Sequence, residues 1–290
     1  MKILVTGATG HLGMKVMDRL IEHGSPRHLI ASVTDPKKAE ALKKKGVDVR
    51  HGDFDFTHTL DHAFKGADRM LLISTMGDNE TRIRQQLAAV EAAKQAKIKF
   101  IAYTSIAKAD KSTLWLAEVH KATETAIRAS GIPFCILRNN WYLENELDSI
   151  KAALDGGGVA TCAGEGKVGW APRDDFALAA ANVLTGMGHS NKVYELSGIP
   201  TTYAGFTESL SNALGRKVPL QNVDDAAFSV LLTSSGLKAG MAAFVAGIHR
   251  SIREGALDVE SGDLENLMGR PLTPMLAALE KLVKEMAVTV

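Results

Sequence analysis

The first half of the chain alternates continuous apolar runs with helical patterns. The runs lie at 2–6, 28–33, 47–50, 69–74, 98–104 and 133–137, as expected for strands buried on both faces of a parallel sheet. Between them, apolar residues recur every three or four positions, most clearly at 11–23, 36–45, 80–96 and 115–130. This alternation with short connections predicts an α/β fold, a doubly wound parallel sheet with helices on both faces.

The segment 80–96 carries the clearest helical stripe of the first half. We expect its apolar residues Ile83, Leu87 and Val90 to face the protein interior. The polar residues between them are expected to face solvent: Arg82, Arg84 and Gln86.

The first strand leads directly into a glycine loop, "TGATGHLG". In a Rossmann fold, the glycine at position 7 would allow a tight turn, Gly10 a close approach to phosphate, and Gly13 close packing of helix on strand. We therefore predict that backbone amides and the helix N-terminus hold the pyrophosphate of a dinucleotide. The alternative is a glycine-rich turn without a ligand. The predicted cofactor-binding residues here are Gly7, Ala8, Thr9, Gly10, His11, Leu12 and Gly13.

The pattern changes after about residue 140. The glycine-rich stretch 154–170 reads as turns joining short strands, "RDDFALAAANVL" opens a helix, and "KVYELSG" reads as a strand. Further helices are predicted at 204–214, 224–235 and 274–287. We therefore predict a dinucleotide-binding domain over 1–140 and a smaller α/β lobe over 141–290, interleaved around the same cleft.

The end of the second strand bears on which dinucleotide would bind. Asp35 could accept from the ribose diol of NAD, whereas Lys37 and Lys38 could favour the extra phosphate of NADP. Asp35 followed by Pro36 also has the pattern of a helix N-cap. The residues by themselves leave the cofactor preference open.

Polar residues follow the later strands as well. Asp53 could accept from the adenine amino group beside Phe54, although a turn would use the same residues. The ends of the fourth and fifth strands carry hydroxyls that could bind a ribose or a substrate oxygen, or cap the strands. These hydroxyl residues are Ser74, Thr75, Thr104 and Ser105.

A general acid is not evident from the pattern. The helix at 115–130 has His120 and Glu124 where a short-chain dehydrogenase would carry Tyr-x-x-x-Lys, so His120 is a candidate acid or a structural histidine. After the sixth strand, Asn139, Asn140, Trp141 and Tyr142 offer amides for a carboxamide and rings for a flat partner, or form a polar strand end.

Composition excludes several classes of function. The net charge of +1 gives no footprint for nucleic acid, and no apolar run is long enough to span a bilayer. Two isolated cysteines argue against a metal site. With no signal peptide before the first strand, we expect a cytoplasmic protein.

The motifs "TGATGHLG", "KFIAYTS", "HKATE" and "LRNNWYLEN" resemble the NmrA-like branch of the atypical short-chain dehydrogenases. Within it they are most similar to the NADPH-dependent quinone oxidoreductase type 2 family and the triphenylmethane reductases. The resemblance implies cofactor contacts from the glycine loop, from Ser74 and Thr75, and from the later residues Asn139, Asn140, Trp141, Tyr142, Leu143, Glu144 and Arg173.

One position departs from that family, which usually grips the 2′-phosphate with an arginine where this chain has Thr34. Lys37 or Lys38 would have to compensate. The resemblance still implies NADP(H), with NAD(H) as the alternative. It also implies hydride transfer to a quinone-like flat acceptor, with the proton from water or His120. The alternatives are a dye reductase and a non-enzymatic redox sensor. The sequence does not distinguish a monomer from a homodimer.

Overall fold

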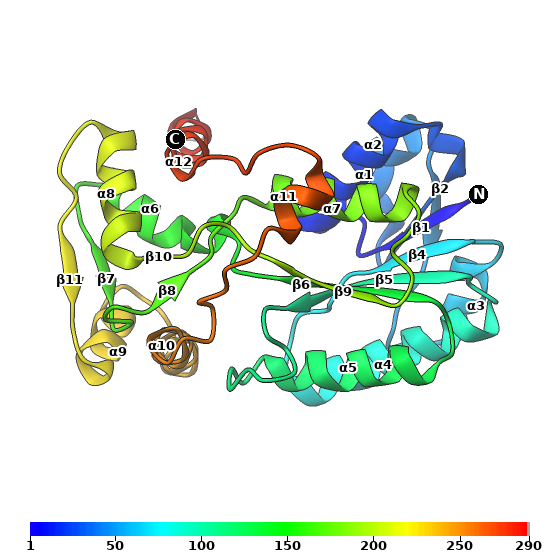
Figure 1. The fold of residues 1–290 in the computed structure, drawn as a ribbon, viewed down its shortest axis with the longest axis horizontal. Helices are drawn as coiled ribbons and strands as arrows, with labels where there is room; N and C mark the ends of the chain where they lie inside the picture. The colour runs from blue at the N-terminus through cyan, green and yellow to red at the C-terminus, as the bar shows by residue number, and fades with distance from the viewer. Residues whose placement is uncertain (289–290) are drawn as a thin grey trace.

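A seven-stranded parallel sheet forms the centre of the larger part of the molecule in the computed structural model, which describes residues 1–288 (Figure 1). All neighbouring strands pair in parallel. In spatial order the strands are β3 (Asp48–His51), β2 (Leu29–Val33), β1 (Ile3–Thr6), β4 (Arg69–Leu72), β5 (Phe100–Ile106), β6 (Phe134–Asn139) and β9 (Lys192–Leu196). Because the strand order reverses at β1, the predicted doubly wound sheet is confirmed.

Helices cover both faces of this sheet (Figure 1). One face packs against α1 (His11–His23), α7 (Arg173–Thr185) and α11 (Asp263–Met268). The other face packs against α3 (His58–Phe64), α4 (Asn79–Gln95) and α5 (Ala117–Ala129). Strands buried on both faces explain the continuous apolar runs of the sequence.

The predicted helix over 36–45 is divided in the structure, with a 3₁₀ helix at Pro36–Ala39 followed by α2 (Glu40–Lys44). The structure also contains helices that the pattern did not predict: α3, α6 (Leu147–Leu154), α10 (Ala239–Arg253) and α11. Three of these have eight residues or fewer, too short for apolar periodicity to show clearly.

The predicted orientation of α4 is confirmed for Arg84, which is exposed, and for Val90, which is buried, but it is wrong for Arg82, Gln86 and Leu87. Arg82 and Gln86 are buried against the sheet, whereas Leu87 is 39% exposed. The buried face continues through Ala89 and Val90 at helical spacing, so Val90 of the predicted apolar stripe is buried, while Ile83 is half-buried. The small alanines of this face allow close packing, and the side chains of Arg82 and Gln86 lie on the same side of the helix as these alanines.

The smaller lobe contains α6, α8 (Tyr203–Leu214), α9 (Asp225–Ser234), α10 and α12 (Met275–Val288), seen on the left in Figure 1. Its short strands β7 (Val159–Thr161) and β11 (Leu220–Asn222) pair in parallel, and β8 (Lys167–Val168) and β10 (Thr201–Thr202) antiparallel. Although α7 and β9 come from the second half of the chain, they pack in the large sheet layer. The chain thus interleaves its two parts, while a boundary at residue 140 stays a prediction.

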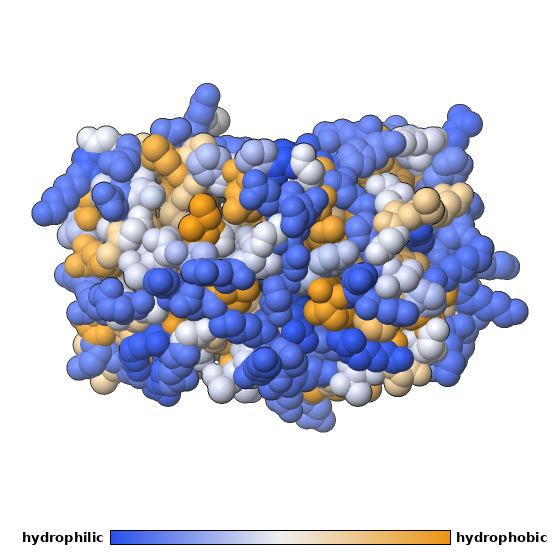
Figure 2. Space-filling model, viewed as in Figure 1, coloured by the Kyte–Doolittle hydropathy of each residue, from blue (hydrophilic) through white to orange (hydrophobic). Residues whose placement is uncertain are grey.

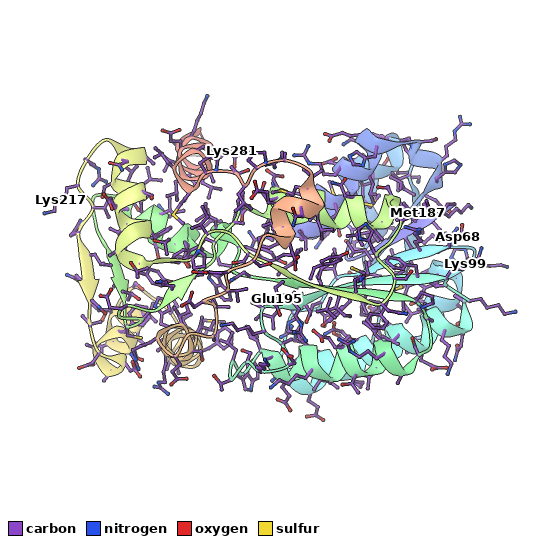
Figure 3. All side chains as sticks on the ribbon, viewed as in Figure 1. Asp68, Lys99, Met187, Glu195, Lys217 and Lys281 are labelled. Carbon is purple, nitrogen blue, oxygen red and sulfur yellow. The ribbon has the colours of Figure 1, made fainter. Side chains whose placement is uncertain are left out.

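An ion-pair cluster joins the two parts. Lys281 of α12, labelled in Figure 3, lies 2.9 Å from Asp174 at the start of α7. Lys15 of α1 lies 3.0 Å from the same carboxylate. Apolar residues on the visible face occur in small separate groups among hydrophilic ones (Figure 2). Within residues 1–288, no helix has the length and apolar character needed to cross a membrane.

Candidate functional site

The glycine loop joins β1 to α1 and leaves amide groups without acceptors. Gly7 has φ +58°, a conformation that favours glycine, and its carbonyl accepts from the Gly10 amide at 2.9 Å. A β-carbon on Gly13 would lie 2.1 Å from that carbonyl oxygen, so only glycine allows α1 to approach this closely. Gly10 is the N-cap and brings no capping side chain. The first-turn amides of α1 therefore fit the pyrophosphate of a dinucleotide.

The other loop residues differ in how they are exposed. Ala8 and Leu12 point into the core, so the loop presents mainly their backbone. Thr9 is half-buried and His11 is exposed at the start of the helix. The binding role of all these residues stays a prediction.

The end of β2 adopts the capping arrangement considered for Asp35. Its Oδ1 accepts from the Lys37 amide at 3.0 Å and caps the 3₁₀ helix that follows. Thr34, Lys37 and Lys38 are exposed. Two lysines therefore remain free to approach a 2′-phosphate, and no arginine stands at the position of Thr34.

The segment after β3 forms a local turn. Asp53 Oδ1 accepts from the Asp55 amide at 2.9 Å, and the Asp53 amide donates to Thr59 Oγ1 at 2.9 Å. Phe54 beside it is half-buried. The predicted adenine contact of Asp53 and Phe54 stays a prediction, and Asp53 already serves the turn.

The predicted hydroxyl residues divide into two groups: Ser74 and Thr75 follow β4, whereas Thr104 and Ser105 lie within the last residues of β5. Thr104 Oγ1 accepts from the Ser74 amide at 3.0 Å, and Ser105 Oγ donates to Glu124 at 2.7 Å, so both stabilise the strand ends. Thr75 Oγ1 is buried and has no hydrogen-bond partner in the structure. Ser74 is half-buried, and its Oγ accepts from Arg82 at 3.0 Å. Ser74 and Thr75 therefore remain available to a ligand.

Asn139 ends β6 and Asn140 follows it, and the two asparagines have different surroundings. Asn140 is fully engaged: its Nδ2 donates to Ser197 and to the Leu257 carbonyl, and its Oδ1 accepts from the Trp141 amide. Asn139 Nδ2 donates to the Tyr142 hydroxyl at 2.9 Å, but its buried Oδ1 has no partner. Asn139 thus offers a carbonyl oxygen of the kind a carboxamide amine would bind.

The remainder of this segment is held from several sides. Glu144 accepts from the Arg173 amide with both oxygens at 3.0 Å, and the Arg173 guanidinium lies 4.9 Å from the centre of the Tyr142 ring. Leu143 is buried in the lobe core. Trp141 Nε1 donates to buried Glu146 at 3.2 Å. These contacts fix the position of Asn139 through its partner Tyr142.

His120 lies inside the protein, on the side of α5 that faces β5. The imidazole is 6% exposed, and its Nδ1 lies 2.9 Å from the hydroxyl of buried Tyr103. Burial lowers the pKa of His120 to about 3, so its ring is neutral near pH 7 and has no imidazolium proton to donate. Its surroundings favour the structural alternative, and its role as an acid stays a prediction.

Two surface hollows lie away from this edge. The first, of about 500 Å³, contains Asp68 and Lys99, which pair with each other at 2.7 Å at the far end of the sheet (Figure 3). The second, of about 680 Å³, lies between β11 and α9. The first is at the amino ends of the strands and the second in the lobe, whereas the orphaned Thr75 and Asn139 oxygens lie at the carboxyl ends. The carboxyl ends are therefore the candidate location of the site.

The reversed strand order and the glycine loop at the carboxyl ends define a Rossmann-type α/β protein. The model of the NmrA-like family matches residues 1–249. The chain belongs to this family, as its motifs predicted.

Similar proteins include several reductases. The chain is 39% identical over 281 residues to quinone oxidoreductase 2 of Escherichia coli (strain K12), covering 97% of this chain and 98% of that one. It is 31% identical over 219 residues to an NAD(P)H azoreductase of Xenophilus azovorans, covering 74% and 75%. The crystal structure of Citrobacter sp. triphenylmethane reductase complexed with NADP(H) matches with a TM-score of 0.93 at 38% identity, covering 97% and 100%.

Proposed function

We propose that the protein is an NADPH-dependent reductase that delivers hydride to a flat, electron-poor acceptor such as a quinone. The observation that carries this proposal is the uncapped amide turn between Gly7 and Gly13 at the carboxyl end of β1. The similar reductases described above support both the reaction and the cofactor.

The residues of this chain would act mainly by binding and orientation. The loop amides would hold the pyrophosphate, and the open oxygens of Thr75 and Asn139 would orient the nicotinamide end. When bound, the cofactor supplies the hydride. A quinone is already electrophilic, so accurate positioning accounts for much of the rate, and water can supply the proton.

We also propose that the protein acts in a reducing cytoplasm. Cys135 and Cys162 are both free and buried, and burial raises their pKa values to about 12 and about 11. Thiols in this state are inert and are not paired as in secreted proteins.

Stopped-flow absorbance of the nicotinamide tests the reaction. We expect the purified protein to oxidise NADPH rapidly when 1,4-benzoquinone is added, and NADH more slowly. An azo dye and a triarylmethane dye, measured in parallel, show which acceptor class is preferred. Tight binding of NADPH without turnover of any acceptor would contradict the proposal and indicate the non-enzymatic sensor.

A further inference from the structure

Two arginines are buried within residues 1–288, and their surroundings differ. Arg138 is 7% exposed and forms ion pairs with Glu124 at 2.9 Å, Asp110 at 2.7 Å and Glu195 at 3.0 Å (Glu195 is labelled in Figure 3). Arg82 is 5% exposed and forms no ion pair with any described residue. Its Nε has no hydrogen-bond partner, and burial lowers the pKa of its guanidinium.

A buried charge without a counter-ion is expensive. The desolvation penalty in a protein is several kcal/mol per ion, and an apolar residue of similar volume is often neutral or stabilising at such a position. The neighbouring Gln86 offers no compensation, because its buried amide also lacks partners. Stability alone therefore gives no reason for an arginine at this place in α4.

Arg82 does have one directed contact, and it leads to the carboxyl edge of the sheet. Its Nη2 donates to Ser74 Oγ at 3.0 Å, and the Ser74 amide is itself held by Thr104. Behind Ser74 lie Tyr103 and His120, both buried and both without a formal charge near pH 7. In this cluster only Ser74 is partly exposed, so the positive charge of Arg82 acts on a ligand through the serine hydroxyl.

The direction of the hydrogen bond decides what Ser74 can do. A hydroxyl has one proton and two lone pairs, and Arg82 occupies a lone pair. Inside the protein the hydroxyl proton faces the oxygen of Tyr103. An acceptor oxygen on the open side of Ser74 competes with Tyr103 for this proton, and the adjacent cation makes the hydroxyl a stronger donor. Ser74 is thereby prepared to donate to an oxygen that gains negative charge.

We propose that Arg82 is a positioning residue that makes the Ser74 hydroxyl a hydrogen-bond donor to the acceptor oxygen during reduction. This inference rests on the proposed function. The acceptor receives hydride, which brings two electrons and leaves one negative charge on its oxygen, while the nicotinamide becomes oxidised. Ser74 stabilises that charge until water supplies a proton. A single donor of this kind typically changes kcat by about 10²–10³-fold.

A double-mutant cycle with 1,4-benzoquinone and NADPH tests the inference. We expect Arg82→Met and Ser74→Ala each to lower kcat by roughly 10²–10³-fold, and the double variant to lose little more than Ser74→Ala. The Kd for NADPH should change less than about threefold, because the effect lies on the acceptor. Arg82→Lys should recover part of the rate. The control Arg19→Met, which removes a surface partner of Glu22, should leave kcat unchanged.

Stability and binding separate this role from a structural one. Removing an uncompensated charge should leave the Tm of Arg82→Met equal to or above that of the native protein. Three results would each overturn the inference. The first is a loss of kcat in the double variant equal to the product of the two single losses. The others are a loss of rate explained by a lower Tm, and weakened NADPH binding in Ser74→Ala. A native protein without turnover would overturn the proposed function as well, whereas native turnover matched by Arg82→Met would overturn this inference alone.

Discussion

Replacing Gly13 by alanine tests whether close packing of α1 on β1 shapes the glycine loop that we propose binds the dinucleotide. The new β-carbon would lie 2.1 Å from the Gly7 carbonyl oxygen and 2.9 Å from Ala8 Cα. Carbon–oxygen contacts normally begin at about 3.3 Å, so the helix or the loop must move by about 1 Å. All of the atoms in contact belong to the backbone, which has no rotamer that would relieve the overlap.

The size of the effect follows from this displacement. Overpacking of this kind costs about 1–3 kcal/mol of unfolding free energy. Loss of one charge-assisted hydrogen bond to the pyrophosphate costs about 1.5–3 kcal/mol, which corresponds to a rise of roughly 10–150-fold in the Kd for NADPH. Gly13→Ala should therefore reduce the free energy of NADPH binding at least as much as the free energy of unfolding.

Fluorescence titration with NADPH and urea denaturation measure the two effects separately. Gly24→Ala, at the other end of α1, is the matched control, because a β-carbon there meets nothing within 4 Å and the backbone is extended. It should change neither quantity by more than about 0.5 kcal/mol. An unchanged Kd for Gly13→Ala would refute the assignment of this turn to the pyrophosphate.

Two further predictions concern cofactor choice and pH. Thr34→Arg should lower the Kd for NADPH by roughly tenfold and leave NADH unaffected, because a guanidinium can clamp the 2′-phosphate; equal changes for both cofactors in a binding titration would contradict this. Burial lowers the pKa of His120 to about 3 and that of His249 to about 4, so the unfolded chain binds protons more tightly below about pH 6.5. The free energy of unfolding, measured by urea denaturation, should therefore be lower at pH 5 than at pH 7 by about 2 kcal/mol for each of the two histidines. The decrease should be smaller in His120→Gln. Equal free energies of unfolding at the two pH values would contradict this prediction.

The strands and the glycine loop were predictable because they depend on local sequence. A continuous β-branched run followed by glycines at spacing three specifies a strand, a turn with positive φ and a helix, all within a dozen residues. The loop of Gly7, Gly10 and Gly13 was therefore found in place. The N-cap at Asp35 was likewise visible in the sequence.

The orientation of α4 could not be predicted in the same way. Its arginine and glutamine at 82 and 86 have the same helical phase as its buried alanines, and hydropathy alone assigns them to the surface. No local signal distinguishes such a polar inward face from an ordinary solvated one.

The sequence by itself determined the strands, the glycine turn and the family, since each depends on residues close together in the chain. Only the tertiary structure decided which polar groups stay open for a ligand. Asn140 is occupied by Ser197 and by the carbonyl of Leu257, more than 50 and 100 residues away, while the carbonyl of Asn139 remains free. Hydrogen-bond partners are set by segments that meet only after folding, so neighbouring residues of the same type can have different functions.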